Sequence, residues 1–322
     1  MLMTQKSRVE LLNKEVQNGF IFIRKSYVKQ YKRQKRSVAE LKRALTSFGN
    51  IVVPVGSFVT RASPKSSDVD IVLLSTFDES KMGRKDEEDW YNSRMNEIKR
   101  ILKNDEFCRQ FLFKRFEKIL RHNIRVPILR LQPFDFSMDI QFDMDEAIRN
   151  SLFVKHCVML DERVAYLNHW LSNLFLLCGI KDSRNGLFSS YHLLSLVIHF
   201  MQYQQHQNMK PILPVIACRT EPIIYKSPNE MCVGELILRF IDFYSNLELE
   251  NIMLDAAKGQ NFPREASSSL KMNQIWLSDP YSSDVIYTTG YSSLKLFKGA
   301  LSKAREAILI PEPFPVEHFM LL

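Results

Sequence analysis

The stretch Val53–Leu74, VPVGSFVTRASPKSSDVDIVLL, holds a Gly-Ser pair, a polar loop and two aspartates at the head of an apolar run. Residues Asp68–Leu74 are rich in Val, Ile and Leu and follow a Ser/Pro/Lys loop, a pattern that predicts a strand. Because side chains alternate between the two faces of a strand, Asp68 and Asp70 are expected to point the same way. Two neighbouring carboxylates repel each other unless one is protonated or a hard cation binds between them.

The Gly-Ser pair before the aspartates predicts a place where a phosphate group can bind. Gly56 lets the backbone approach a ligand closely, and Ser57 adds a hydroxyl and an N–H that a phosphate can accept from. With the two aspartates, the pair suggests a site for Mg²⁺ and a nucleotide. The alternative is an ordinary turn before a solvated strand end, because Asp-x-Asp is a common sequence.

Length and composition indicate a globular protein. The chain has 322 residues, enough for one large or two ordinary domains. Hydrophobic residues make up 45% and charged residues 25%, which is typical of soluble proteins. No apolar run approaches the roughly 18–20 residues of a membrane span, and the N-terminus lacks the apolar core of a signal peptide. We therefore predict no membrane partner and no secretion.

The cysteines indicate the cellular compartment of the protein, and its net charge indicates the kind of partner it binds. The five cysteines lie far apart with no C-x-x-C pair, which argues against a zinc site or a disulfide framework and favours a reducing compartment. They are Cys108, Cys157, Cys178, Cys218 and Cys232. We expect the cytoplasm, with the nucleus as a second location. The net charge of +8 favours a polyanionic partner, although many basic proteins bind no nucleic acid.

The N-terminal residues predict helix. Apolar side chains recur at helical spacing from Thr4 to about Leu45, in one helix or two. Within them, the basic run Lys29–Arg36, KQYKRQKR, is either a solvated helix face or a contact for RNA phosphates or a partner protein.

The following segment predicts a mixed sheet with helices packed on one side. Its strands are expected at Ile51–Val55, Asp68–Leu74, Arg125–Leu131 and Ser137–Phe142, with a mainly helical segment at 78–123. In the last strand the apolar side chains alternate with Asp139, Gln141 and Asp143, which places Asp139 on a polar face. Asp139 can therefore join Asp68 and Asp70 if the two strands pair.

The rest of the chain has a helical pattern. Residues 151–245 include a predicted helix at Tyr191–Gln204, which Ser189 or Ser190 can cap, and another at Gly234–Tyr244. Residues 255–272 are polar and predict a loop. An extended piece at 274–277 and a last helix at Ser293–Leu309 follow.

Taken in order, these landmarks resemble the DNA polymerase β-like nucleotidyltransferases, and within them the noncanonical poly(A) polymerases and terminal uridylyltransferases. Gly56-Ser57 followed by Ser67-Asp68-Val69-Asp70 resembles the catalytic signature of the family, and Val126–Leu131 followed by Asp139–Phe142 resembles its third-aspartate strand. The resemblance runs from about residue 50 to residue 307.

Further landmarks follow the aspartates. Asn150-Ser151 resembles a pair that contacts the ribose, and Gly186–Tyr191 resembles the segment that supplies a base-stacking tyrosine. Residues 234–244 and Asp279-Pro280-Tyr281 resemble the poly(A)-polymerase-associated segment.

The resemblance implies an α+β fold, with a polymerase β-like nucleotidyltransferase palm domain and a mostly helical poly(A)-polymerase-associated central domain. It implies three parts: N-terminal helices at 1–47 that pack on the central domain, a catalytic domain at 48–150, and the helical domain at 151–322.

The resemblance also implies an activity, the template-independent addition of ribonucleotides to RNA 3′ ends. The expected product is an AMP tail, with UMP or relaxed choice as alternatives. Asp68, Asp70 and Asp139 would be the catalytic residues and would hold Mg²⁺ or Mn²⁺. The nucleotide-binding residues would be Gly56, Ser57, Ser67, Asn150, Ser190, Tyr191 and Asp279. Because no standard RNA-binding module is present, we expect an RNA-binding partner protein to select the RNA.

This chain departs from the family pattern at two sets of positions that bind the nucleotide. The family places two lysines on a helix that reaches the triphosphate, and Ser172 and Leu176 stand there in this chain. Charge-assisted contacts are each worth roughly 1.5–3 kcal/mol, so their loss should weaken binding unless Lys181 or Arg184 compensates. The glutamate and histidine of uridine-selective members correspond to Ser282 and Val285, which favours adenine or relaxed base choice.

Two other functions remain open. A catalytically inactive family member that serves as a scaffold is favoured by the missing lysines and opposed by the intact aspartates. A small-molecule nucleotidyltransferase fits the Gly-Ser and Asp motifs but not the C-terminal landmarks. His199 lies on an apolar helix stripe, so we expect a core histidine rather than a catalytic base.

Overall fold

The structure is a computed structural model, and it describes residues 5–65, 68–74, 84–106, 108–109, 116–119, 127–133, 135–206, 209–216, 224–264, 273–281 and 286–309. The chain divides into two compact units, each of which is described by itself. The sheet unit comprises Arg24–Arg61 and Lys65–Leu152, and the helical unit comprises Met1–Ile23, Ala62–Pro64 and Phe153–Leu322.

The sheet unit is built on a five-stranded sheet in the order β1-β2-β5-β4-β3. Its strands are β1 (Ile51–Val55), β2 (Val69–Leu74), β3 (Phe116–Ile119), β4 (Ile128–Leu131) and β5 (Met138–Phe142). Strands β2 and β5 are parallel, while the other neighbours are antiparallel. The sheet is therefore mixed, as predicted.

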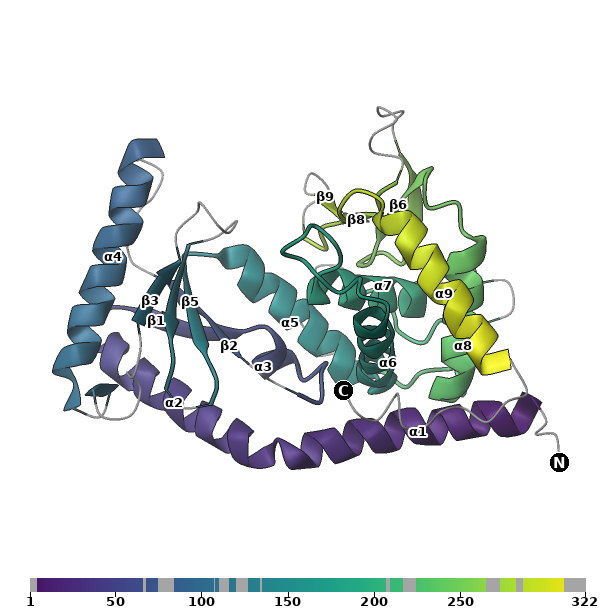
Figure 1. Cartoon of the computed structure of the whole chain (residues 1–322), viewed down its shortest axis with the longest axis horizontal. Coiled ribbons are helices and arrows are strands. Elements are labelled where there is room, and N and C mark those ends of the chain that lie inside the picture. Colours follow the sequence, from purple (N-terminus) through teal and green to yellow (C-terminus); the bar gives the residue numbers. More distant parts are fainter. Residues whose placement is uncertain are drawn as a thin grey trace. The chain divides into compact units, whose positions relative to one another are not determined.

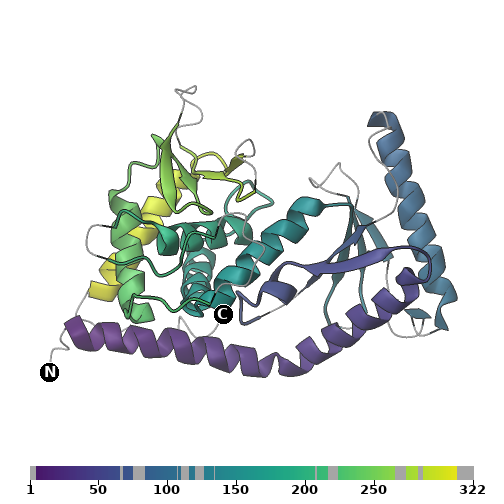
Figure 2. The same ribbon diagram turned by 180° about the vertical axis from the view of Figure 1, so that it is seen from behind.

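Two helices pack with this sheet around one core (Figures 1 and 2). They are α2 (Val28–Thr46) and α4 (Arg84–Asn104). Leu41 and Leu45 of α2 and Met95 of α4 are fully buried, together with Ile71 and Ile140 of the sheet. Alternating apolar residues on the strands and apolar residues at helical spacing thus meet in a single core.

One predicted helix is partly wrong. The segment 78–123 was expected to be mainly helical, but Phe116–Ile119 forms β3 and pairs with β4. Its four residues satisfy their backbone groups on the neighbouring strand instead of within a helix turn. Other parts of that segment lie outside the described residues.

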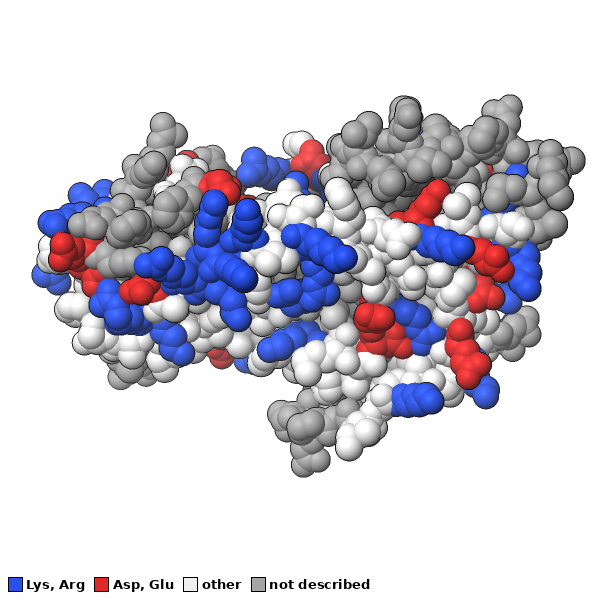
Figure 3. Space-filling model, turned by 90° about the horizontal axis from the view of Figure 1, so that it is seen from below, with Lys and Arg blue, Asp and Glu red and all other residues white. Residues whose placement is uncertain are grey.

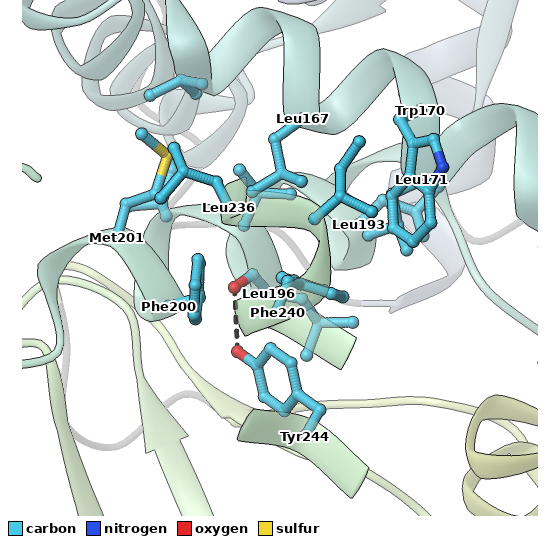
Figure 4. Packing of buried hydrophobic residues seen from close by; sticks show 14 of the residues in the cluster. Leu167, Trp170, Leu171, Leu193, Leu196, Phe200, Met201, Leu236, Phe240 and Tyr244 are labelled. Atoms are coloured by element: carbon cyan, nitrogen blue, oxygen red, sulfur yellow. Dashed lines mark hydrogen bonds between the residues drawn. The ribbon is translucent and has the colours of Figure 1, made fainter. Parts of the chain in front are cut away.

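The helical unit contains most of α1 (Gln5–Ser26), the second half of α5 (Asp145–Leu160), and all of the later helices. These are α6 (Arg163–Leu177), α7 (Ser190–Gln202), α8 (Val233–Asn246) and α9 (Ser293–Leu309). The last helix has the predicted bounds. In the core, the rings of Phe200 and Phe240 lie 5.4 Å apart and those of Phe240 and Tyr244 4.8 Å apart (Figure 4). The Tyr244 hydroxyl donates to the carbonyl of Leu196 at 2.8 Å.

A four-stranded sheet in the order β7-β6-β8-β9 belongs to the same unit. Its strands are β6 (Ile252–Asp255), β7 (Gln260–Pro263), β8 (Trp276–Ser278) and β9 (Ile286–Thr288). The loop predicted at 255–272 is therefore wrong for residue 255 and residues 260–263, which are strand, whereas residues 256–259 form the turn of the hairpin. Gly259, with φ +57°, makes this turn, and a Cβ there would overlap the carbonyl of Gln202.

The N-terminal helices divide between the units. Residues 1–47 were expected to pack on the helical domain. Residues 1–23 belong to the helical unit, but residues 24–47 belong to the sheet unit, because α2 buries its apolar face in that core. Within the described part of the chain, none of the helices combines the length and the apolar character needed to cross a membrane.

Candidate active site

The turn after β1 is shaped by Gly56. Its backbone has φ +68° and ψ −153°, a region open almost only to glycine, and α3 (Ser57–Thr60) begins directly after it. A Cβ at Gly56 would overlap Oδ2 of Asp70 and lie 3.3 Å from its Cγ. The Gly56 N–H donates to Oγ of Ser151 at 2.9 Å, and that hydroxyl donates to the carbonyl of Ala147 at 2.7 Å. Ser151 thus holds the turn against the Asp70 carboxyl.

Two of the three predicted aspartates lie side by side. Asp70 of β2 is in register with Asp139 of β5, and the parallel pairing puts both side chains on one face of the sheet. Asp139 is 6% exposed. Asp68 is exposed and directly precedes β2. It lies close enough to Asp70 to affect its charge.

The electrostatics of this face favour a proton or a cation. The pKa of Asp70 is raised to about 7, first by burial of its carboxyl group and then by the negative charges of Asp139 and Asp68. Arg130 lowers it by a smaller amount. The ionised form of Asp70 is therefore disfavoured on this face, and a bound cation would stabilise it.

Arg130 is a residue of this face to which the sequence analysis gave no role. It lies on β4 directly opposite Asp139. Its Nε donates to Oδ1 of Asp139 at 2.8 Å and its Nη2 donates to Oδ2 at 2.7 Å. The pair raises the pKa of Arg130 above its ordinary value. A basic residue at an alternate position of a short apolar strand is the signal that could have indicated it.

The fit to a metal ion differs among the aspartates. In the part of the chain that the structure describes, no group of three His, Cys, Asp or Glu side chains is placed to hold a metal. Asp68 and Asp70 offer the carboxylate oxygens that hard cations prefer. Both oxygens of Asp139 are engaged by Arg130, so Asp139 fits a metal site only after an exchange of partners.

Besides Gly56, two of the predicted phosphate and ribose residues belong to the described part of the sheet unit. Ser57 is the half-buried first residue of α3, and Asn150 is a half-buried residue of α5. Ser67 lies outside the described residues.

The predicted base-binding residues belong to the helical unit. Ser189 is the N-cap of α7, because its Oγ accepts from the His192 N–H at 3.1 Å, and the exposed Ser190 is the first helical residue. Tyr191 is half-buried and packs against the core of the unit. Asp279 is buried, and its Oδ1 accepts from the Tyr281 N–H at 2.7 Å, so one carboxylate oxygen stabilises the local turn.

The positions that lack the family lysines carry no cation. Ser172 is half-buried and Leu176 is exposed on α6. Lys181 is half-buried, which lowers its pKa, and Arg184 is exposed. Ser282 and Val285 lie outside the described residues.

His199 is a core histidine, as predicted. It is fully buried, with Nδ1 2.9 Å from the Tyr244 hydroxyl and Nε2 2.8 Å from Oδ1 of Asn261. Burial lowers its pKa to about 4.

Comparisons with known proteins agree with this fold. The family described as poly(A) RNA polymerase, mitochondrial-like, central palm domain matches residues 12–158. The Drosophila melanogaster poly(A) RNA polymerase gld-2 homolog A is 24% identical over 254 residues, which cover 70% of this chain and 18% of that protein. Human poly(A) RNA polymerase GLD2 is 24% identical over 259 residues, covering 70% of this chain and 49% of that protein. The chain thus spans less than half the length of either relative.

Solved structures match most of the chain. The structure of the GLD-2/RNP-8 complex gives a TM-score of 0.72 at 20% identity and covers 98% of each chain. The Cid1 poly(U) polymerase bound to MgGTP gives a TM-score of 0.72 at 17% identity, covering 94% of this chain and 98% of that one.

The fold is α+β, as predicted, and it is shared with the solved GLD-2 and Cid1 polymerase structures. The matches support the noncanonical poly(A) polymerase and nucleotidyltransferase family, as the resemblance found in the sequence implied.

Proposed function

We propose that the chain adds ribonucleotides to RNA 3′ ends without a template. In this reaction the 3′-hydroxyl oxygen of the RNA bonds to the α-phosphorus of a ribonucleoside triphosphate, and the bond to the leaving pyrophosphate breaks. The observation that carries the proposal is the pairing of Asp70 with Asp139 beside the Gly56 turn. The similarity to GLD2 and Cid1 supports the same chemistry.

The residues of the sheet unit would bind the metal ion, the phosphates and the ribose. Asp68 and Asp70 would hold Mg²⁺ or Mn²⁺, and Asp139 would join them or orient the RNA hydroxyl. A bound divalent ion supplies stabilisation of the charge that develops on the phosphate oxygens. The backbone at Gly56 and Ser57, together with Ser67, would bind phosphate oxygens. Asn150 would bind the ribose.

In the helical unit, Ser190 and Tyr191 would contact the incoming base and Asp279 would complete the nucleotide site. An aromatic ring stacks on any base, so Tyr191 is compatible with ATP as well as other nucleotides. We propose ATP as the substrate used best, with UTP or mixed use as the alternative. The solved GLD-2/RNP-8 complex supports a further part of the proposal, that a partner protein selects the RNA.

The proposed location is the cytoplasm, with the nucleus as a second location. The free state of the four described cysteines, Cys108, Cys157, Cys178 and Cys232, supports a reducing compartment.

The test is extension of a labelled RNA oligonucleotide with Mg²⁺ and each of the four nucleoside triphosphates. Asp70→Asn keeps the shape of the side chain but removes its charge, and we expect it to lower the rate at least 100-fold. Asp242→Asn, which changes a half-exposed carboxylate of α8 that pairs with Arg305, should leave the rate unchanged. Equal rates for the two variants, or no extension by the unaltered protein with any nucleotide, would contradict the proposal.

The second candidate is a catalytically inactive family member that acts as a scaffold in an RNA-processing complex. Ser172 and Leu176 in place of lysines and the engagement of Asp139 by Arg130 favour it. It predicts that RNA is bound but not extended, with or without candidate partners.

A further inference from the structure

Helix α2 carries most of the net charge of the protein. Its 19 residues include seven Lys or Arg and one Glu, so this one helix has a net charge of +6 in a chain whose total is +8. Spread evenly, the same excess would have little effect on a polyanion. Concentrated on one helix, it attracts phosphates strongly at low ionic strength.

The charges of α2 lie on its solvent side. The helix buries Gln34, Ser37, Leu41, Ala44 and Leu45. Lys29, Lys32, Lys35 and Arg36 are exposed, and Figure 3 shows Lys and Arg side chains gathered on this surface. With a rise of about 1.5 Å per residue, the span from Lys29 to Lys42 is about 20 Å, which is long enough for several successive phosphates.

Three of these lysines are available to a ligand. Among the described side chains, no carboxylate lies within ion-pair distance of Lys29, Lys32 or Lys35. Arg33 pairs with Asp135 at 3.3 Å, but both side chains are more than half exposed, so the pair is weak.

Aromatic rings join this surface to the loop that leads to the aspartates. The Arg61 guanidinium lies 4.1 Å from the centre of the Tyr31 ring, and the Lys35 ammonium lies 5.7 Å from it. The Lys65 ammonium lies 5.8 Å from the centre of the Tyr27 ring. Arg61 and Lys65 precede Asp68 by only a few residues, so cations and rings continue from α2 toward the candidate active site.

We propose that the exposed face of α2, together with Arg61 and Lys65, binds the phosphates of single-stranded RNA upstream of the 3′ end. This inference rests on the proposed function, because the ligand is the RNA whose end is extended. Basic surfaces interleaved with aromatic rings are typical of single-strand binding. An anionic membrane fits less well, since it requires an exposed apolar face and Val28 is the one large apolar side chain of α2 that is exposed.

The test measures binding without nucleotide. Fluorescence anisotropy of a labelled 15-nucleotide poly(A) RNA is followed from 50 to 300 mM KCl. The triple variant Lys29→Gln/Lys32→Gln/Lys35→Gln is compared with Lys14→Gln/Lys295→Gln/Lys303→Gln, which removes the same charge from exposed lysines of α1 and α9. Unchanged thermal midpoints confirm that both variants are folded.

The α2 variant should bind at least tenfold more weakly at 100 mM KCl. Each phosphate contact contributes about 0.7 to the slope of log K against log salt, so the slope should decrease by about 2. The control variant should stay within twofold of the unaltered protein. Equal losses in the two variants, or no RNA binding by the unaltered protein, would overturn the inference. So would lysine-dependent binding to phosphatidylserine vesicles with unchanged RNA binding.

Extension assays separate this inference from the proposed function. The α2 variant should keep kcat at saturating RNA and show a raised KM for RNA. Extension with an unchanged KM overturns the α2 surface and leaves the activity intact. RNA binding through α2 without extension by the unaltered protein overturns the activity and leaves the surface intact.

Discussion

Replacement of Gly56 by alanine tests whether the turn after β1 sets the position of Asp70. The new Cβ would overlap Oδ2 of Asp70, so the carboxyl must retreat by about 1 Å to restore ordinary contact. A misplacement of about 1 Å at a reacting centre can lower a rate about 100-fold, which corresponds to about 2.7 kcal/mol. The backbone region itself costs a non-glycine residue roughly 1–3 kcal/mol.

Gly49→Ala is the matched control. Gly49 also has a positive φ, +78°, but a Cβ there meets no atom within 4 Å. The Gly49→Ala variant should therefore lose stability only because alanine disfavours this backbone conformation, and it should keep its activity. Initial rates of nucleotide addition to a labelled RNA and unfolding free energies from urea titration are measured for both variants.

The expected outcome is a rate about 100-fold lower for Gly56→Ala than for Gly49→Ala, under conditions where both are folded. The reasoning fails if the two variants have rates within threefold of each other. It also fails if Gly56→Ala loses activity only in proportion to the fraction of unfolded protein, because the effect is then on stability and not on Asp70.

Two further predictions concern buried charge. Arg130→Met leaves the buried Asp139 without its two donors, so the unfolding free energy should fall by about 3 kcal/mol in urea titration, with much of the loss recovered in Arg130→Met/Asp139→Asn. If the double variant is no more stable than the single, the ion pair is not the cause. The second prediction is that acid destabilises the protein through His199, whose folded-state pKa of about 4 lies below its ordinary value of 6.5. The unfolded chain binds the proton first, so this stability is complete above pH 6.5 and is lost as the pH falls toward 4. Between pH 7.5 and 5.5 the unaltered protein should lose about 1 kcal/mol more than His199→Gln, and equal losses would exclude His199 as the group that titrates.

The sequence predicted the sheet strands that have a strong apolar pattern. The alternation in Met138–Phe142 placed Asp139 on a polar face, from which it could join Asp70 if the two strands paired, and β2 and β5 do pair with these residues in register. The hairpin of β6 and β7 was missed because Gln260–Pro263 has no alternating apolar pattern. Its turn brings Gly259 against Gln202, a contact distant in sequence that no local pattern predicts.

The roles of Arg130 and Ser151 also depend on distant contacts. Arg130 opposes Asp139 only through the antiparallel pairing of β4 and β5, and Ser151 meets the Gly56 N–H across 95 residues of chain. Residue type and local spacing carry no information on such partners, so the sequence predicted the carboxylates but not the groups that position them.

The ion pair of Arg130 and Asp139 bears on whether the protein needs a bound metal ion in order to fold. Some small domains fold only when their metal ion is bound, because their ligands do not come together without it. Here an arginine of the same chain supplies part of the counter-charge. We therefore expect the chain to fold without a divalent ion, so that folding would not depend on the metal binding proposed above.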